Sequence, residues 1–416
     1  MNSLYRNTLA VFAVLVFYCN LHEYLHEVYQ VGVPWHWVLA FIILSLPLLA
    51  GQVMTSAILQ EPIVVWCFGY VWVTLVWFML GSQSEMSWQE VRWRVLAVFE
   101  ILGFLAIFMD AQASKFAQLT LVIAVHIGTM INIYELFVPM SFSHVVGRSA
   151  GLYVNSNSSA EALVLGMILG ATALPTWYRS AFILLVGAGV FVTYSRAGLI
   201  GWLIAVGGLI LGRFIGSTHL VRTGLIALFL IGFVLLPKAD QILITLDQAG
   251  SLNADTQERL AWFINPLGVD DRSGWSRKSV AREAWERVAE HPFLGGGTGA
   301  VHQGLEIPPH NLFLSHMIDH GVLGVMLMPL LLVALIWRAE GEGQRMVFIF
   351  SCVILWFCFF THSLLNYVHS LLLMALVSAL AIHRDRRRDQ AGGGRLTAHS
   401  GRWRSQTPGV VLRDAP

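Results

Sequence analysis

The sequence contains a succession of apolar stretches that are long enough to cross a lipid bilayer. A transmembrane helix needs about 20 predominantly apolar residues to span the hydrocarbon core. Twelve stretches approach this length, near residues 7–21, 33–51, 62–81, 94–110, 117–138, 159–175, 178–193, 197–213, 222–236, 311–336, 346–361 and 364–383. Only 12% of the residues are charged, against about 25% in soluble domains. We therefore expect an all-α polytopic membrane protein with about 12 transmembrane helices.

Lysine and arginine in the short loops predict how these helices are oriented. Such residues are enriched on the cytoplasmic side of membrane proteins. Counting back from the basic C-terminal segment, every second loop carries them: Arg338 and Arg345, Arg213 and Arg222, Arg179, and Lys115. With an even number of spans, this series predicts that both termini are cytoplasmic. No small-residue cleavage site follows the first apolar run, so we expect it to be a retained helix. Arg92 and Arg94, in a loop that the count places outside, are the exception.

The pattern divides the chain into four parts: residues 1–236 with nine spans, 237–310 as one long outside loop, 311–383 with three spans, and 384–416 as a disordered basic tail. In the long loop, residues 256–264 and 275–291 have apolar side chains at helical spacing. Tryptophan favours the membrane–water interface, which suits Trp262, Trp275 and Trp285. We expect a small helical cap on the membrane surface.

Five basic residues at hydrophobic boundaries all map to the outside: Arg148, Arg196, Arg282, His310 and His362. Ionisable groups at such positions are costly and commonly functional. Their location on one side predicts a single site.

The two arginines nearest the middle of the chain lie beside predicted helix starts. Arg148 precedes Gly151 and Asn155, and the next helix would be capped by Asn157 or Ser158. A free helix N-terminus with an arginine is suited to an anion. Arg196 lies in a very tight turn between two apolar helices. For both arginines the alternative is an ordinary boundary residue that faces lipid headgroups.

The segment 282–299 predicts a helix that ends near Glu290, because His291 precedes a proline and is biased away from helical geometry. The following Gly295–Gly297 run permits positive φ angles. The run is either a flexible connector or a backbone that lines a groove, with Arg282 facing it.

His310 and Asn311 lie where the long loop meets the next membrane helix. A histidine with an ordinary pKa near 6.5 can accept a proton at neutral pH, although a cap or a headgroup contact is the alternative. His362 lies at the last outside turn and would extend the site. His316 and His320 are four residues apart, but no third ligand accompanies them, so we expect no metal.

This residue set suits transfer of a sugar from a lipid diphosphate. The leaving group is acidic and needs charge stabilisation, which arginines provide by binding phosphate oxygens. The outside loops contain no Asp-x-Asp pair that would hold a divalent cation instead, and ATP is not expected there. The attacking hydroxyl needs a base, and a positioned histidine is a candidate.

The chain resembles the O-antigen ligase / O-antigen polymerase superfamily of bacterial inner membranes. The resemblance rests on the Arg148–Gly151–Asn155 segment, on Thr193-x-Ser195-Arg196-Ala197, on Arg282-x-x-Trp285 before Pro292 and Gly295–Gly297, and on His310-Asn311 leading to Gly321 and Gly324. It covers the second half of the chain, whereas the first 140 residues match only as unspecific membrane helices.

The resemblance implies a GT-C-like fold and an inverting, metal-independent glycosyltransferase without a cofactor, whose site faces the periplasm. Its donor would be a polysaccharide on undecaprenyl diphosphate. It further implies that Arg148, Arg196 and Arg282 bind the diphosphate and that His310 is the base. Asn155, Asn311 and His362 would support them.

Several reactions and partners remain open within this class. A ligase would use lipid A-core as acceptor, a polymerase another lipid-linked repeat, and a protein O-oligosaccharyltransferase a pilin-like protein. The single long loop favours the ligase. A lipid-linked sugar flippase would carry polar residues near the membrane midplane, whereas here they gather at one boundary. We expect membrane lipid but no nucleic acid as a partner.

Overall fold

The computed structural model describes residues 3–145, 147–248, 250–251, 253–264, 272–303, 305 and 307–383. Within these residues the chain forms helices and turns and no strand, which confirms the all-helical prediction. The predicted tail, residues 384–416, lies outside the described residues.

Each of the twelve predicted stretches overlaps a helix. The helices are α1 (Ser3–Ala13) with the π-helix η1 (Val14–Tyr18), α3 (Pro34–Met54), α4 (Pro62–Leu80), α5 (Glu85–Phe108), α6 (Ala111–Phe137), α7 (Ser156–Ala173), α8 (Thr176–Phe191), α9 (Arg196–Leu211), α10 (Ser217–Leu235), α15 (Val322–Ile336), α16 (Gly341–Cys358) and the C-terminal helix Val368–His383. By length and composition, α3, α4, α6 and α16 suffice to cross a membrane, and the bent N-terminal pair would be a fifth span. The chain is consistent with a polytopic membrane protein, and the total number of spans stays a prediction.

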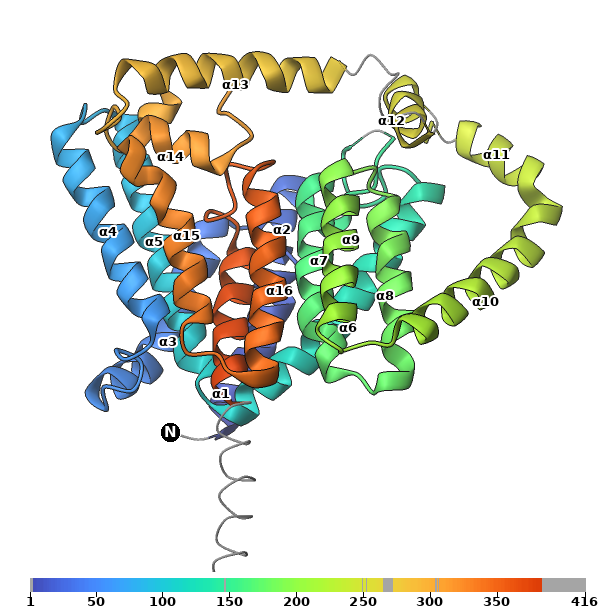
Figure 1. The fold of residues 1–416 in the computed structure, drawn as a ribbon, viewed down its shortest axis with the longest axis horizontal. Helices are drawn as coiled ribbons and strands as arrows, with labels where there is room; N and C mark the ends of the chain where they lie inside the picture. The colour runs from blue at the N-terminus through green and yellow to red at the C-terminus, as the bar shows by residue number, and fades with distance from the viewer. Residues whose placement is uncertain are drawn as a thin grey trace, which may run out of the picture.

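Helix α7 lies at the centre of the bundle and packs against α6, α8, α9 and α16 (Figure 1). All its residues from Ser158 to Ala171 are buried. Its glycines permit this close packing: a Cβ added to Gly170 would lie 3.2 Å from the Phe182 ring, and one added to Gly166 would collide with the Tyr18 hydroxyl. Small residues are the usual means by which membrane helices approach one another.

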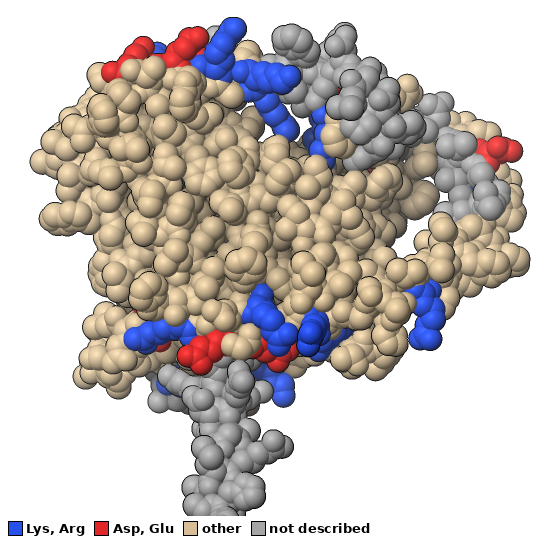
Figure 2. Space-filling view, in the orientation of Figure 1, with Lys and Arg blue, Asp and Glu red and all other residues tan. Residues whose placement is uncertain are grey.

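Charged side chains gather at the two opposite ends of the bundle (Figure 2). At one end, Arg6 lies 3.2 Å from Asp110 and Arg338 lies 3.8 Å from Glu61. Two further arginines there donate to helix-end carbonyls: Arg179 to Phe214 and Arg345 to Gly212. The grouping agrees with the predicted cytoplasmic series, and the orientation itself stays a prediction.

The long loop forms a cap over the other end of the bundle. It contains α11 (Ala239–Gln248), α12 (Ala254–Ile264) and α13 (Arg272–Glu290). Helix α13 lies across the end of the bundle, and α12 lies near the ends of α7 and α9 (Figure 1). The helical segments predicted at 256–264 and 275–291 are therefore confirmed, as is the end of α13 before Pro292.

Two predicted boundaries were wrong. The segment between the predicted stretches 7–21 and 33–51 was expected to be a loop, but it contains α2 (Leu21–Tyr29), which is bent by 44° from the first helix. The span expected at 311–336 is broken into α14 (Leu312–His320) and α15 at Gly321, whose φ is +61°. A side chain at Gly321 would collide with the Phe293 backbone, so the break lets the loop after α13 pack closely against this helix.

Arg94, the exception to the charge pattern, is a buried structural residue in α5 and is only 2% exposed. Its guanidinium group forms ion pairs with Glu90 (2.8 Å) and with Asp319 of α14, and it donates to His320 Nε2 at 2.9 Å. A buried arginine needs such partners to offset its lost hydration. Arg94 therefore joins α5 to α14 and says nothing about loop orientation.

We expect that Gly297→Ala destabilises the protein. Gly297 has φ +98°, and a Cβ there would lie 2.5 Å from the Gly81 Cα at the end of α4. Backbone strain of this kind costs about 1–3 kcal/mol. Thermal unfolding of the purified protein in detergent should show a lower midpoint. Gly207→Ala is the control, because its Cβ would meet nothing within 4 Å; equal midpoints for the two variants would contradict the expectation.

Candidate active site

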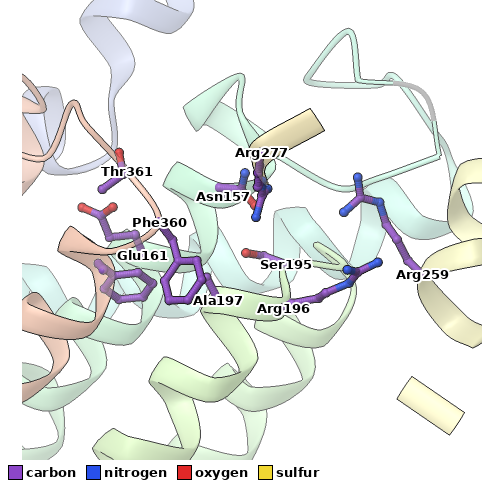
Figure 3. Close-up of a pocket in the computed structure, with 10 residues that line it drawn as sticks. Asn157, Glu161, Ser195, Arg196, Ala197, Arg259, Arg277, Phe360 and Thr361 are labelled. Atoms are coloured by element: carbon purple, nitrogen blue, oxygen red, sulfur yellow. The ribbon is translucent and has the colours of Figure 1, made fainter. Parts of the chain in front are cut away.

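A pocket lies at the capped end of the bundle, between the ends of α7, α9 and α16 and the helices α12 and α13 (Figure 3). Its lining combines three arginines with a carboxylate, aromatic rings and small polar groups: Asn157, Glu161, Ser195, Arg196, Ala197, Arg259, Arg277, Phe357, Phe360 and Thr361. Residues more than 160 positions apart in the sequence therefore share one cavity.

The arginines occupy one side of the pocket (Figure 3). Arg196 is the first residue of α9, whose N-cap Ser195 accepts a hydrogen bond from Gly198 N at 3.2 Å. The Trp262 ring of α12 lies over the Arg196 guanidinium, 4.8 Å from it. Arg259 comes from α12 and Arg277 from α13. Three cationic side chains beside a helix N-terminus create a positive electrostatic field, which favours an anion.

The opposite side is formed by α7 and the turn after α16 (Figure 3). Glu161 projects from the buried helix α7 and is 2% exposed. Its Oε1 accepts a hydrogen bond from Ser370 Oγ at 2.8 Å and lies 3.8 Å from His369 Nε2. Phe360 and Thr361 complete this side. The pocket is thus divided into a cationic half and a half that is acidic and aromatic.

Arg148 lies next to the pocket but does not line it. Its Nε donates to Thr193 O at 3.1 Å and its Nη2 to Asn157 Oδ1 at 3.2 Å. It therefore ties the start of α7 to the turn before α9. The predicted cap of α7 was wrong: Asn155 holds that position and accepts from Asn157 N at 2.8 Å, because its backbone is extended where the helix begins.

The segment that carries Arg148 is fixed by Glu135, which the sequence analysis did not single out. Glu135 is buried near the end of α6. Its Oε2 accepts from Ala150 N and Gly151 N, both at 2.8 Å, and its Oε1 accepts from Ser143 Oγ at 2.8 Å. A charged acceptor with several donors holds a loop firmly. This carboxylate sets the path of the chain into α7.

His310 and His362 lie together beside the pocket, with ring centroids 5.6 Å apart. His362 follows the pocket residue Thr361 directly. His310 is at an exposed position, where partial desolvation and the nearby Arg277 cation lower its pKa below the ordinary value. Burial, followed by the charges of nearby histidines, lowers the pKa of His362 to about 4. Asn311 caps α14 by accepting from Leu314 N at 3.1 Å.

Arg282, predicted to bind phosphate, points away from the pocket. Its side chain is 80% exposed, and its Nε lies 4.0 Å from Glu286 one helical turn later. Arg277 lies five residues earlier on the same helix, a rotation of about 140° at 3.6 residues per turn, and it faces the bundle. Of the arginines on α13, Arg277 and not the predicted Arg282 lines the pocket, and Arg259 of α12, which the sequence did not single out, lines it too. A role for Arg282 in binding phosphate stays a prediction.

The glycine run after α13 does not lie beside Arg282 either. Gly296 N donates to Ile318 O at 2.8 Å and Gly297 N to Asp319 O at 3.0 Å. With Trp77 and Phe293 it lines a separate groove at the end of α4. The positive φ angles of Gly295 and Gly297 serve this close contact between α4 and α14.

Among the residues that the structure describes, no three His, Cys, Asp or Glu side chains are grouped closely enough to hold a metal ion. The His316–His320 pair is buried against Arg94. A metal-independent reaction stays a prediction.

The fold is consistent with a polytopic helical membrane protein, and the pocket at one end of its bundle is lined by three arginines. Residues 181–329, from α8 to α15, match the family model described as O-Antigen ligase. This match, which includes Arg196, Arg259, Arg277 and His310, confirms the resemblance to the O-antigen ligase / O-antigen polymerase superfamily. It indicates an activity of ligase or polymerase type, that of a glycosyltransferase-like membrane enzyme. No curated protein and no solved structure matches the chain.

Proposed function

We propose that the protein is an O-antigen ligase, which moves a polysaccharide from undecaprenyl diphosphate to lipid A-core. The observation that carries the proposal is the pocket lined by Arg196, Arg259 and Arg277, with His310 close enough to Arg277 to feel its charge. A diphosphate needs several cationic donors, and the attacking acceptor hydroxyl needs a base close to them. The family match over this part of the chain supports the same class of reaction.

In this proposal the arginines and His310 have different roles in the reaction. The arginines bind the diphosphate oxygens and stabilise the negative charge that develops as the bond from the anomeric carbon to the phosphate oxygen breaks. His310 takes the proton of the acceptor hydroxyl while its oxygen attacks that carbon from the opposite face. The product has an inverted anomeric centre, undecaprenyl diphosphate departs, and the proton remains on His310.

Position in the cell follows from this function. The donor lipid and the lipid acceptor both require a membrane, and the α12–α13 cap would lie on the periplasmic face of the inner membrane. The single long segment 237–310 favours the ligase over the polymerase. Helix α10, whose apolar residues Leu228, Phe229 and Phe233 are exposed, would be in contact with lipid.

Expression in a ligase-null strain tests the proposal. Lipopolysaccharide analysed on a gel should regain its ladder of O-antigen chains. The strain carrying a known ligase is the positive control, and equal membrane levels of both proteins should be checked by immunoblot. If the known ligase restores the ladder and this protein does not, the ligase assignment is wrong. Restored chain length in a polymerase-null strain would instead identify a polymerase.

Transfer by the purified protein should be insensitive to chelators. Arginines take the place that a divalent cation has in many enzymes of this kind, since they remain charged and bind phosphate bidentately. Initial rates with and without EDTA should agree within error. A loss of activity that added Mg²⁺ or Mn²⁺ reverses would overturn the metal-independent mechanism.

A further inference from the structure

We propose that the half of the pocket opposite the arginines is a subsite for the sugar bonded to the donor diphosphate, and that Glu161 accepts hydrogen bonds from its hydroxyl groups. The inference rests on the proposed function and goes beyond it, because it assigns the sugar end of the donor to named residues on α7 and the turn after α16.

The first argument is the division of the pocket. Arg196, Arg259 and Arg277 lie on one side, whereas Glu161, Phe360 and Thr361 lie on the other (Figure 3). A carboxylate repels phosphate, so the diphosphate must occupy the cationic side. A sugar diphosphate is itself divided in this way, with charge at one end and neutral hydroxyl groups at the other. Only one orientation of such a donor satisfies both halves.

The second argument is the burial of Glu161 and its small number of partners. Glu161 is a carboxylate on the central helix of a membrane protein, with a side chain only 3% exposed. Burying a charge is expensive unless hydrogen bonds or a cation compensate. Oε1 has the Ser370 hydroxyl, with His369 Nε2 at 3.8 Å. Within the described part of the chain, Glu161 pairs with no lysine or arginine, which leaves Oε2 as an acceptor for a ligand.

The aromatic residues on the Glu161 side of the pocket suit the apolar face of a sugar ring. Phe357 and Phe360 place aromatic rings at the pocket, and the C–H face of a pyranose is apolar enough to pack on such rings. Thr361 adds a hydroxyl group whose Oγ1 accepts from Ser363 N at 3.2 Å. Binding sites commonly combine an apolar wall with a few placed polar groups to fix orientation. With the sugar seated here, the bond that breaks lies between the two halves and close to His310.

Glu161→Gln tests the subsite with little change in shape. We expect a rise of about 10- to 100-fold in the KM for a short-chain lipid diphosphate sugar, because hydrogen bonds to a charged acceptor contribute more than neutral ones. The inhibition constant of inorganic pyrophosphate should change less than about twofold, because pyrophosphate occupies only the arginine half. Arg196→Ala should show the reverse pattern and weaken pyrophosphate strongly.

The matched control is Glu61→Gln, which alters a buried carboxylate at the far end of the bundle, beside Arg338, and should leave both constants unchanged. Phe360→Leu provides a second, milder variant that should raise KM for the sugar donor. Unfolding midpoints in detergent identify variants that fail to fold. If Glu161→Gln fails to fold, Ser370→Ala replaces it in the same comparison, because this variant removes the hydrogen bond to Glu161 but keeps the Glu161 charge.

Binding measurements separate this inference from the proposed function. We expect the wild-type protein to bind a lipid diphosphate sugar more tightly than the same lipid diphosphate without sugar, and Glu161→Gln to remove the difference. Equal affinities for the two lipids in the wild type would overturn the subsite while leaving a diphosphate site intact. Absence of binding to either lipid would overturn the proposed function itself. An equal loss of pyrophosphate and sugar-donor binding in Glu161→Gln would also refute the subsite.

Discussion

Arg277→Ala should reduce transfer by about 100- to 1,000-fold, whereas Arg282→Ala should retain nearly full activity. The range is that expected for loss of one preorganised group that stabilises developing charge. Arg277 lines the pocket, whereas Arg282 is 80% exposed and pairs only weakly with Glu286. Both arginines lie on α13 and have similar local structure. The two variants therefore differ mainly in the direction of the side chain that is removed.

The measurement is the initial rate of glycan transfer by purified variants in detergent, with expression and unfolding midpoints as controls for folding. Arg277→Lys separates charge from geometry: a lysine keeps the charge but cannot bind two phosphate oxygens with a planar fork, so activity should recover only in part. Loss of activity in Arg282→Ala together with a fully active Arg277→Ala would reverse our placement of the diphosphate.

His310→Ala should reduce transfer by about 100- to 10,000-fold, the usual range for general acid–base catalysis. His310 is close enough to Arg277 for that cation to lower its pKa. His362→Ala should have a smaller effect, since the pKa of His362 shows no influence of the pocket arginines. Similar activity for the wild type and His310→Ala would remove this residue from the mechanism.

The pH dependence of transfer provides a separate test of His310. A base must be neutral to accept a proton. Partial desolvation and the Arg277 cation lower the pKa of His310 below 6.5, so the neutral form dominates at pH 7. The rate should therefore decline at a more acidic pH than it would for a histidine with an ordinary pKa. His362, with a pKa of about 4, stays neutral over most of that decline, and Arg277→Ala should move the decline to higher pH.

The sequence marked only some of the residues that gather at the pocket, and the residues that it did not mark share one property. Arg196 and His310 were predicted because each lies at the abrupt end of an apolar stretch, where a charged residue is conspicuous. Arg277 lies on the polar helix α13 among other arginines, and Arg259 lies on a short loop helix where a charged residue is ordinary, so nothing local distinguishes either of them. The side of such a helix that faces the bundle depends on how α12 and α13 lie over α7 and α9.

Glu161, within the helical bundle, is a second residue whose role the local sequence does not reveal. The sequence places it near the start of an apolar stretch, where a cap or a boundary residue is the ordinary explanation. Only the packing of α7 at the centre of the bundle buries it and brings it beside Ser370 and His369, more than 200 residues away. Arg94 was likewise unexplained until its partners Asp319 and His320 on α14 became visible.

The sequence by itself determined the all-helical membrane architecture, the helical long loop and the positions of Arg196 and His310, because hydropathy and helix-breaking residues act over short distances along the chain. The tertiary structure alone decided which arginines meet, that Glu161 faces them across a pocket, and that Arg148 and Asn155 mainly hold the backbone. Those outcomes depend on the relative rotation and position of helices that are far apart in the sequence but in contact in the fold. Local patterns record which faces are apolar, but they do not record which polar residue on the remaining face reaches the site.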